Sequence, residues 1–372
     1  MDERMKFVTE WWSGEYTMRE LAAAYDVSRK TGYKWIARHA ASGVGGLADQ
    51  SRRPHGHPAT TDRALVARLV ATRRRFPHWS AAKLVTWLQQ HEPQVAWPRR
   101  TTAYALLRDT GEPRKRRPRR RPPITRHLRP ATQVNELWTT DFKGQFRLRD
   151  RAYCHPLTLR DSVSRFVLRC DGLRQESTVV TRPCFERAFR EYGLPERIRS
   201  DNGRPFAGHG LAGLSQLSVW WLRLGIALER ITPGHPEQNG SHEQFHAVLK
   251  KHTTRPPAAH LRAQQDRFDA FRREYNEERP HDALGGQPPA RLYHASHRSY
   301  PARLPPLDYP RHLEIRRVDM HGSISWRNRG LFVSQALGGE PIALEETDDA
   351  VWTVWYGTVT LARFDERHWT WL

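Results

Sequence analysis

The sequence has 372 residues, enough for two to four domains, and it carries 61 Lys and Arg against 40 Asp and Glu, a net charge of +21. Positive charge on this scale favours a polyanionic partner, while 14 Trp and a long folded pattern argue against a small basic coat protein. Three scattered Cys without a CxxC pair exclude a disulfide framework, and no apolar stretch is long enough to span a membrane.

Residues 1–55 are predicted to form a helix-turn-helix domain. Thr17 and Glu20 make a capping box for its second helix, and Ser28 caps a third. The start of that third helix lies where a recognition helix meets base edges and phosphates, although an ordinary three-helix bundle with a charged face is the alternative. The apolar residues expected to hold the helices together are Phe7, Val8, Trp11, Trp12, Leu21, Ala24, Tyr25, Tyr33, Trp35 and Ile36. The expected DNA contacts are Arg29, Lys30, Thr31 and Lys34.

A second helical unit that binds DNA is predicted at residues 56–111, where Ser80 caps the middle helix. A linker follows at 112–133. It is almost wholly cationic and broken by proline, so it cannot bury itself and is expected either to contact the phosphate backbone or to remain a solvated spacer. Its cationic residues are Arg114, Lys115, Arg116, Arg117, Arg119, Arg120 and Arg121.

Residues 134–296 are predicted to form a mixed α/β domain. Expected strands lie at 137–141, 153–159, 164–170, 196–200 and 227–231, and expected helices at 177–192, 211–225 and 238–251. An initial meander followed by alternating strands and helices fits a mixed sheet with helices on both faces. After a Pro-rich stretch at 301–310, short strands separated by glycines predict a small β-barrel over residues 310–372.

Three carboxylates in the α/β domain are the candidate catalytic residues. Asp141 and Asp201 each follow a short apolar strand, and Glu243 opens a helix after a turn. Carboxylates placed in this way can converge on two Mg²⁺ (or Mn²⁺) ions, an arrangement common in phosphodiester chemistry; the alternative is three solvated side chains at loop edges. Lys250 and Lys251 lie two turns further along the same helix, where they would track bound DNA or favour the helix dipole.

The residues around these acids resemble the retroviral-integrase superfamily, and their continuation is similar to the DDE transposases of bacterial insertion sequences. The resemblance runs from about residue 5 to the C-terminus. It implies an RNase H-like core, a second helix-turn-helix that is possibly winged, and a C-terminal domain placed like that of integrases. The motifs that carry it are Asp201-Asn202-Gly203, Pro236-x-x-Asn239-Gly240-x-x-Glu243, Leu217–Trp221, Pro233–Pro236 and Tyr275–Leu284.

The resemblance also implies roles for residues near the acids. Asp161 is expected to support the structure without taking part in catalysis. His235 and His242 are expected to contact substrate or to pack, and not to bind metal. The separation of Asp201 and Glu243 exceeds the family's usual spacing by roughly two helical turns, and the extra residues are expected within 207–215.

The sequence is therefore interpreted as a transposase that binds the terminal inverted repeats of its element, cleaves there and joins the 3′-hydroxyl to target DNA. Two metal ions per active site, double-stranded DNA and at least a dimer are implied, and no membrane or nucleotide partner is expected. The protein is expected in the cytoplasm, associated with the nucleoid when bound to DNA. Two alternatives stay open: a transposase-derived repressor that binds without cutting, and an RNase H-like nuclease acting on RNA–DNA hybrids.

Overall fold

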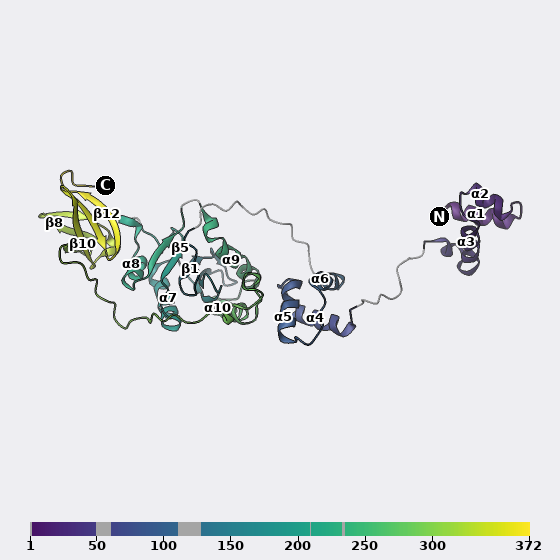
Figure 1. The fold of residues 1–372 in the computed structure, drawn as a ribbon, viewed down its shortest axis with the longest axis horizontal. Coiled ribbons are helices and arrows are strands. Elements are labelled where there is room, and N and C mark those ends of the chain that lie inside the picture. Colours follow the sequence, from purple (N-terminus) through teal and green to yellow (C-terminus); the bar gives the residue numbers. More distant parts are fainter. Residues whose placement is uncertain (1, 50–60, 111–127, 209, 233–234) are drawn as a thin grey trace. The chain divides into compact units, whose positions relative to one another are not determined.

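The structure, a computed structural model, describes residues 2–49, 61–110, 128–208, 210–232 and 235–372 (Figure 1). The seven cationic linker residues from Arg114 to Arg121 lie outside these ranges. The chain divides into two compact units, residues 1–62 and 63–372, and each is described by itself. Over the described residues, no helix is both long and apolar enough to cross a membrane.

The first unit is the expected three-helix domain, with α1 (Asp2–Ser13), α2 (Met18–Ala24) and α3 (Arg29–Ser42). The capping box is present, because the Glu20 amide donates to the Thr17 hydroxyl and the Glu20 carboxylate accepts from the Thr17 amide. Ser28 caps α3 by accepting from the Thr31 amide at 3.1 Å. Both predicted helix starts are confirmed.

The packing of this unit differs from the predicted apolar set at three positions. Trp12 is 63% exposed, Tyr33 is 55% exposed and Ala24 is exposed as well, so none of them is a core residue, whereas Phe7 is fully buried. A residue that the pattern did not single out completes the core. Gly32 lies on α3 against the Phe7 ring and the Met18 sulfur, and a Cβ there would come within 2.7 Å of both. The missing side chain lets α3 approach α1 and α2 closely.

The second helical unit contains α4 (Arg63–Arg75), α5 (Ala81–His91) and α6 (Arg100–Asp109). Ser80 caps α5 as predicted. Residues 61–110 are all described and contain no strand, so the possible wing is absent from them. This unit contacts the segment that follows α10 (Leu261–Arg273): the Trp79 indole donates to Glu274 at 2.8 Å and the Gln90 amide donates to the Gly286 carbonyl at 3.0 Å.

The core domain is built on a mixed sheet. Its strands are β1 (Leu137–Phe142), β2 (Phe146–Arg147), β3 (Tyr153–Asp161), β4 (Val167–Leu173), β5 (Arg197–Ser200) and β6 (Ala227–Arg230). β3 pairs antiparallel with β4 and β1, while β1, β5 and β6 run parallel in that order. The short β2 pairs with the start of β3 and was not predicted. An RNase H-like sheet is thereby confirmed.

Helices α7 (Thr178–Tyr192), α8 (Gln216–Arg223), α9 (Gly240–Thr253) and α10 accompany this sheet (Figure 1). Trp138, Phe189 and Trp221 lie in one fully buried cluster between the sheet, α7 and α8. The predicted helix at 211–225 was too long, because Ser215 forms a capping box with Ser218 and starts α8 at Gln216. The residues before Ser215 form a short 3₁₀ turn, η2 (Leu211–Gly213).

The C-terminal domain is all β, as predicted, but its sheet is open. Strands β7 (Glu314–Arg317), β10 (Pro341–Asp348), β11 (Val351–Tyr356), β12 (Val359–Asp365) and β13 (Thr370–Trp371) form an antiparallel sheet in the order β13-β12-β11-β10-β7. Strands β8 (Ser323–Trp326) and β9 (Arg329–Phe332) form a separate hairpin. Over residues 313–372, all described, no strand pairing closes the sheet into a barrel.

The long stretch after Asp201 connects the core to this β domain. Leu214 and Val219 are buried in the same cluster as Val354 and Phe364 of the β domain. Gly210 lies so close to Ser334 that a Cβ would come within 2.2 Å of its hydroxyl. The extra residues expected at 207–215 therefore contribute to the contact between the two domains.

Candidate active site

Asp141 and Asp201 emerge at the same edge of the core sheet. Asp141 is in β1, opposite Thr158 of β3, and Asp201 directly follows β5. Because β1 and β5 are parallel neighbours, their C-terminal ends lie side by side and present both carboxylates together. Glu243 is in the first turn of α9, a helix that contacts β1, and its side chain is exposed.

The other two carboxylates act on the pKa of Asp141. Burial and, to a lesser extent, the negative charges of Asp201 and Glu243 together raise the pKa of Asp141 to about 7, against the opposing effects of the Phe142 amide and Lys143. A carboxyl group so perturbed is typical of a functional site.

Asp201 is perturbed in the same direction. Burial raises its pKa, the Gly203 amide opposes this by donating at 3.1 Å, and Glu176 adds to the rise. The three acids are not preassembled into a metal cage: among the described residues, no group of three or more His, Cys, Asp or Glu has the spacing of a metal site.

A buried polar network lies behind Asp141. The Thr158 hydroxyl donates to the Asp141 carbonyl at 3.0 Å and lies 2.7 Å from His242 Nε2 and 2.8 Å from His246 Nε2. His242 Nδ1 is also 2.9 Å from the Thr139 hydroxyl. The fully buried His242 is therefore a packing residue, in agreement with one of its two expected roles.

His246 was missed by the sequence reasoning, although it lies one helical turn beyond both His242 and Glu243. Its Nδ1 is 3.5 Å from Asp141 Oδ2. Burial lowers its pKa to about 3, so the imidazole is neutral near pH 7 and the contact is not an ion pair. The spacing of His242 and His246 at i and i+4 was the available signal for a shared buried face.

Asp161 supports the structure, as expected. One carboxylate oxygen accepts from the Asn135 amide at 2.8 Å, and the other accepts from the Ser164 amide and hydroxyl at 2.7 and 2.6 Å. With its oxygens committed to backbone and hydroxyl donors and its side chain fully buried, Asp161 fixes the turn between β3 and β4.

The comparisons with known proteins match almost every part of the chain. The integrase core domain family matches residues 131–236 and 224–289, which contain all three acids. Helix-turn-helix and homeodomain-like families match residues 3–55 and 31–107. The C-terminal domain of IS481 family transposases matches residues 313–370. Together these matches support an insertion-sequence DDE transposase. The chain is therefore a DNA-binding enzyme of transposition, a polynucleotidyl transferase.

Similar curated proteins come from bacterial insertion elements. The transposase is 29% identical to an uncharacterized 31.7 kDa protein of insertion element IS407 from Burkholderia multivorans, over 71% of this chain and 92% of that protein. It is 25% identical to an uncharacterized 39.2 kDa protein of IS476 from Xanthomonas euvesicatoria, over 76% and 80%. A solved HTLV-2 integrase catalytic core domain in complex with magnesium aligns with 16% identity and a TM-score of 0.36, over 45% of this chain and all of that one.

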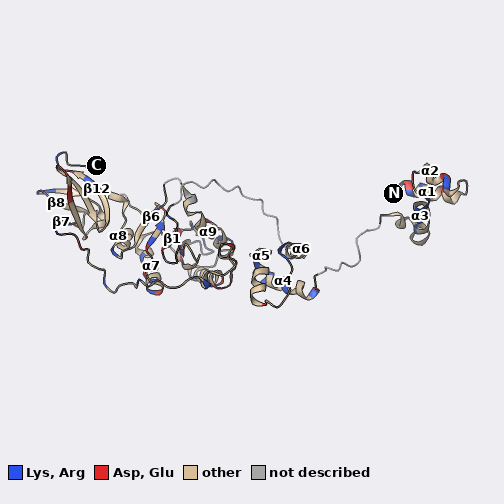
Figure 2. Cartoon of the chain, in the orientation of Figure 1, with Lys and Arg blue, Asp and Glu red and all other residues tan. Residues whose placement is uncertain are grey.

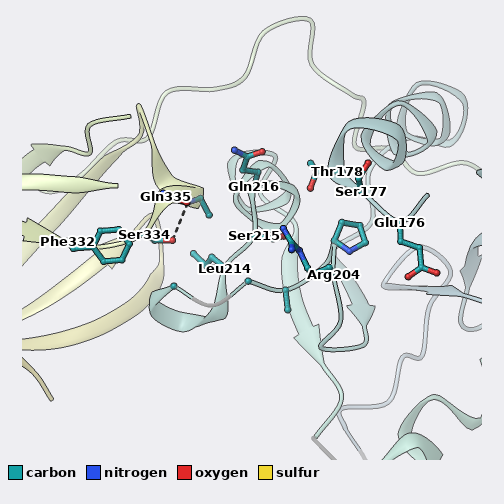
Figure 3. Close-up of a pocket in the computed structure, with 15 residues that line it drawn as sticks. Glu176, Ser177, Thr178, Arg204, Leu214, Ser215, Gln216, Phe332, Ser334 and Gln335 are labelled. Carbon is teal, nitrogen blue, oxygen red and sulfur yellow. Dashed lines mark hydrogen bonds between the residues drawn. The ribbon is translucent and has the colours of Figure 1, made fainter. Parts of the chain in front are cut away.

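A cavity of about 740 Å³ lies where the transposase core meets the C-terminal β domain (Figure 3). It lies between the first turns of α7 and α8 on one side and the β domain on the other, where Ser334 caps a short turn. Glu176, which raises the pKa of Asp201, and Arg204, three residues after Asp201, both line it. The lining of the cavity thus runs from Glu176 and Arg204 to Ser334 of the C-terminal domain and includes none of the three acids.

The residues expected to contact DNA are accessible. Arg29, Lys30 and Lys34 are exposed on α3, and Thr31 is half-buried with its hydroxyl 2.9 Å from that of Ser28. Lys250 and Lys251 are exposed in the last turn of α9. Basic residues occur in every described domain (Figure 2). The DNA contacts of these side chains stay a prediction.

Proposed function

We propose that this transposase binds the terminal inverted repeats of its element, cleaves the DNA there and joins the freed 3′-hydroxyl to target DNA by two-metal-ion phosphoryl transfer. The observation that carries the proposal is the placement of Asp141 and Asp201 at the C-terminal ends of two parallel neighbouring strands, where the charge of Asp201 contributes to the raised pKa of Asp141. Like charges held close together at the end of two parallel strands are stabilised by a divalent cation.

The donor set fits Mg²⁺ or Mn²⁺. The three acids supply only carboxylate oxygens, which these hard cations prefer, while the nearby His242 and His246 are engaged in the network behind β1. Asp141, Asp201 and Glu243 would together hold the two ions. The ions would activate the attacking oxygen and stabilise the leaving oxygen.

The chain's own residues prepare this site. The Thr158 hydroxyl holds the backbone of Asp141, and the Gly203 amide orients Asp201. Glu243 is exposed, so its carboxylate can turn towards the pair without leaving a packed position. Two element ends must be brought together for joining, and we propose that at least two copies of the chain do so, with α3 of each contacting a terminal repeat.

The test is an excision assay with a supercoiled plasmid that carries the element ends, the purified transposase and Mg²⁺. We expect cuts at the element ends, and then joining of the 3′-hydroxyl to a second DNA. Specific binding of the ends without any cut, under Mg²⁺ and Mn²⁺ alike, would instead identify a repressor. Cleavage restricted to RNA–DNA hybrids would identify a nuclease.

A further inference from the structure

A group of cationic side chains surrounds the start of α9. Arg160 of β3 and Arg165 of the following turn both donate to the hydroxyl of Ser241, in the first turn of this helix. We call Arg160 and Arg165 the cationic cluster. Arg160 is only 2% exposed.

The cationic cluster has a donor without an acceptor. Arg160 Nε is buried and has no hydrogen-bond partner among the described residues. A buried donor left unpaired costs roughly 1–3 kcal/mol, and more when it is charged. The neighbouring carboxylate of Asp161 is already occupied by the Asn135 and Ser164 amides. These arginines are therefore short of an anion.

The mutual electrostatics agree with this shortage. Burial lowers the pKa of Arg160, Tyr275 opposes this, Arg165 lowers it further and Asp161 raises it. Two positive charges thus lie close together beside a carboxylate whose oxygens already accept other hydrogen bonds.

We propose that the cationic cluster and Ser241 bind one backbone phosphate of DNA at the start of α9. The helix has 14 residues, and its N-cap residue Asn239 makes no side-chain capping hydrogen bond. Its N-terminus therefore adds a favourable dipole to the unpaired guanidinium donor. Arginines bind phosphate oxygens with charge-assisted hydrogen bonds, which supply the missing acceptor.

DNA is the source of phosphate that fits best, and this assignment rests on the proposed function. Ser241 is two residues before Glu243 in the same turn of α9, so a phosphate bound there belongs to the strand that reaches the acids. The bound phosphate would also fix the first turn of α9. It thereby gives Glu243 a defined position that the protein alone does not impose, in agreement with the absence of a preassembled cage among the described residues.

The experiment pairs protein variants with modified DNA. Full-length transposase is titrated with duplexes of the element end, each neutralised by a methylphosphonate at one successive backbone position. We expect one position at which neutralisation weakens binding by wild type on the order of tenfold. Arg165→Gln should weaken binding of unmodified DNA by a similar factor and show no further loss at that position, while Arg165→Lys should keep part of the sensitivity.

Arg187→Gln is the matched control, because it removes one arginine charge from the core surface beside a different cavity. It should leave the full methylphosphonate effect in place. If the loss of binding caused by Arg165→Gln adds to the loss caused by the methylphosphonate at every backbone position, the proposal is overturned. Inorganic phosphate, compared with chloride at equal ionic strength, should raise the unfolding midpoint of wild type more than that of Arg165→Gln; an equal rise would also contradict the site.

These readouts do not require catalysis. A protein that shows the coupled loss at one phosphate but never cuts DNA would refute the proposed function and leave the phosphate site standing. A protein that cuts element ends but shows no such coupling would support the proposed function and refute the phosphate site. Stabilisation by inorganic phosphate without any methylphosphonate coupling would overturn the assignment to DNA.

Discussion

Buried charges near the two ends of strand β5 differ in whether oppositely charged side chains compensate them. At its start, Arg197 donates to Glu136 at 3.0 Å and to Glu229 at 2.8 Å, so each charge has a partner. Just beyond its end, Asp201 is partly buried beside Asp141 with its pKa raised. The difference teaches how to separate structural charge from functional charge: a buried charge that the fold compensates holds the fold together, and one that the fold leaves uncompensated awaits a ligand.

The largest expected effect is on catalysis at the uncompensated end. Asp141→Asn, Asp201→Asn and Glu243→Gln each keep the shape of the side chain and remove the charge that would hold a cation. We expect each to reduce strand cleavage by about 10³-fold or more, because the ions stabilise the transition state by several kcal/mol. The excision assay measures the rate.

DNA binding by the same three variants is the control. It should stay close to that of wild type, since the helix-turn-helix surfaces lie elsewhere in the sequence. Substantial cleavage by any one variant would remove that residue from the site and would weaken the contrast between the two ends of β5.

Removing the charge of Arg197 at the start of β5 should lower the stability of the protein. Arg197→Gln leaves Glu136 and Glu229 buried without their shared cation, and we expect a loss of about 3–5 kcal/mol in the free energy of unfolding. Denaturant titration measures it. Arg199 also contacts Glu229 and will soften the loss, so a change below about 1 kcal/mol would show that the network is more solvated than its geometry indicates.

Removing the charge of Asp141, near the end of β5, should instead raise the stability of the protein. The pKa of Asp141 in the folded protein is about 7, against an ordinary value of 3.8. The folded state therefore keeps this proton to higher pH, and the charge destabilises it increasingly from about pH 4 up to about pH 7. Without divalent metal at pH 8, Asp141→Asn should be more stable than wild type by on the order of 2 kcal/mol, less than the full shift implies because Asp141 is partly solvated.

The pH dependence is the check on that gain. The advantage of Asp141→Asn should shrink as the pH falls from 7 to 4 and disappear below about pH 3, where wild-type Asp141 is protonated in both states. Thermal unfolding with EDTA across this range measures it. A gain that is independent of pH would mean that packing, and not charge, separates the two proteins.

The smallest effect concerns charges that are simply exposed. Replacing Arg29, Lys30 or Lys34 with Ala should leave stability within about 0.5 kcal/mol, because each side chain is solvated. Binding to the terminal repeat should weaken, by about 1–3 kcal/mol for a residue that reads a base. Equal losses on repeat and random DNA for all three would limit these residues to phosphate contacts.

The sequence predicted the parts of this fold that depend on local chemistry. Thr17 with Glu20, Ser28 and Ser80 were visible as helix starts because a cap depends only on neighbouring residues. The end of β1 at the acids and the position of Glu243 were also visible, through turn signals and motif spacing. The start of α8 was predicted too early, at residue 211. The mixed pattern of polar and apolar residues continues across Ser215, so the true cap did not stand out.

What the sequence could not predict depends on distant residues coming together. His246 and Thr158 are far apart in the chain, and only the packing of α9 on the sheet brings them within 2.8 Å. Arg160 and Arg165 meet at the Ser241 hydroxyl only through tertiary packing. The C-terminal sheet stays open because of how its strands pair, which no local sequence pattern shows.

Metal binding tests the central claim most directly. Mn²⁺ titration of the full-length protein with cleaved element-end DNA, followed by electron paramagnetic resonance, counts the ions bound at each chain. The account predicts two bound Mn²⁺ for wild type and loss of both in Asp141→Asn, with Arg187→Gln unchanged. Equal Mn²⁺ binding by wild type and Asp141→Asn would contradict it, because the buried carboxylates would then not be the ligands.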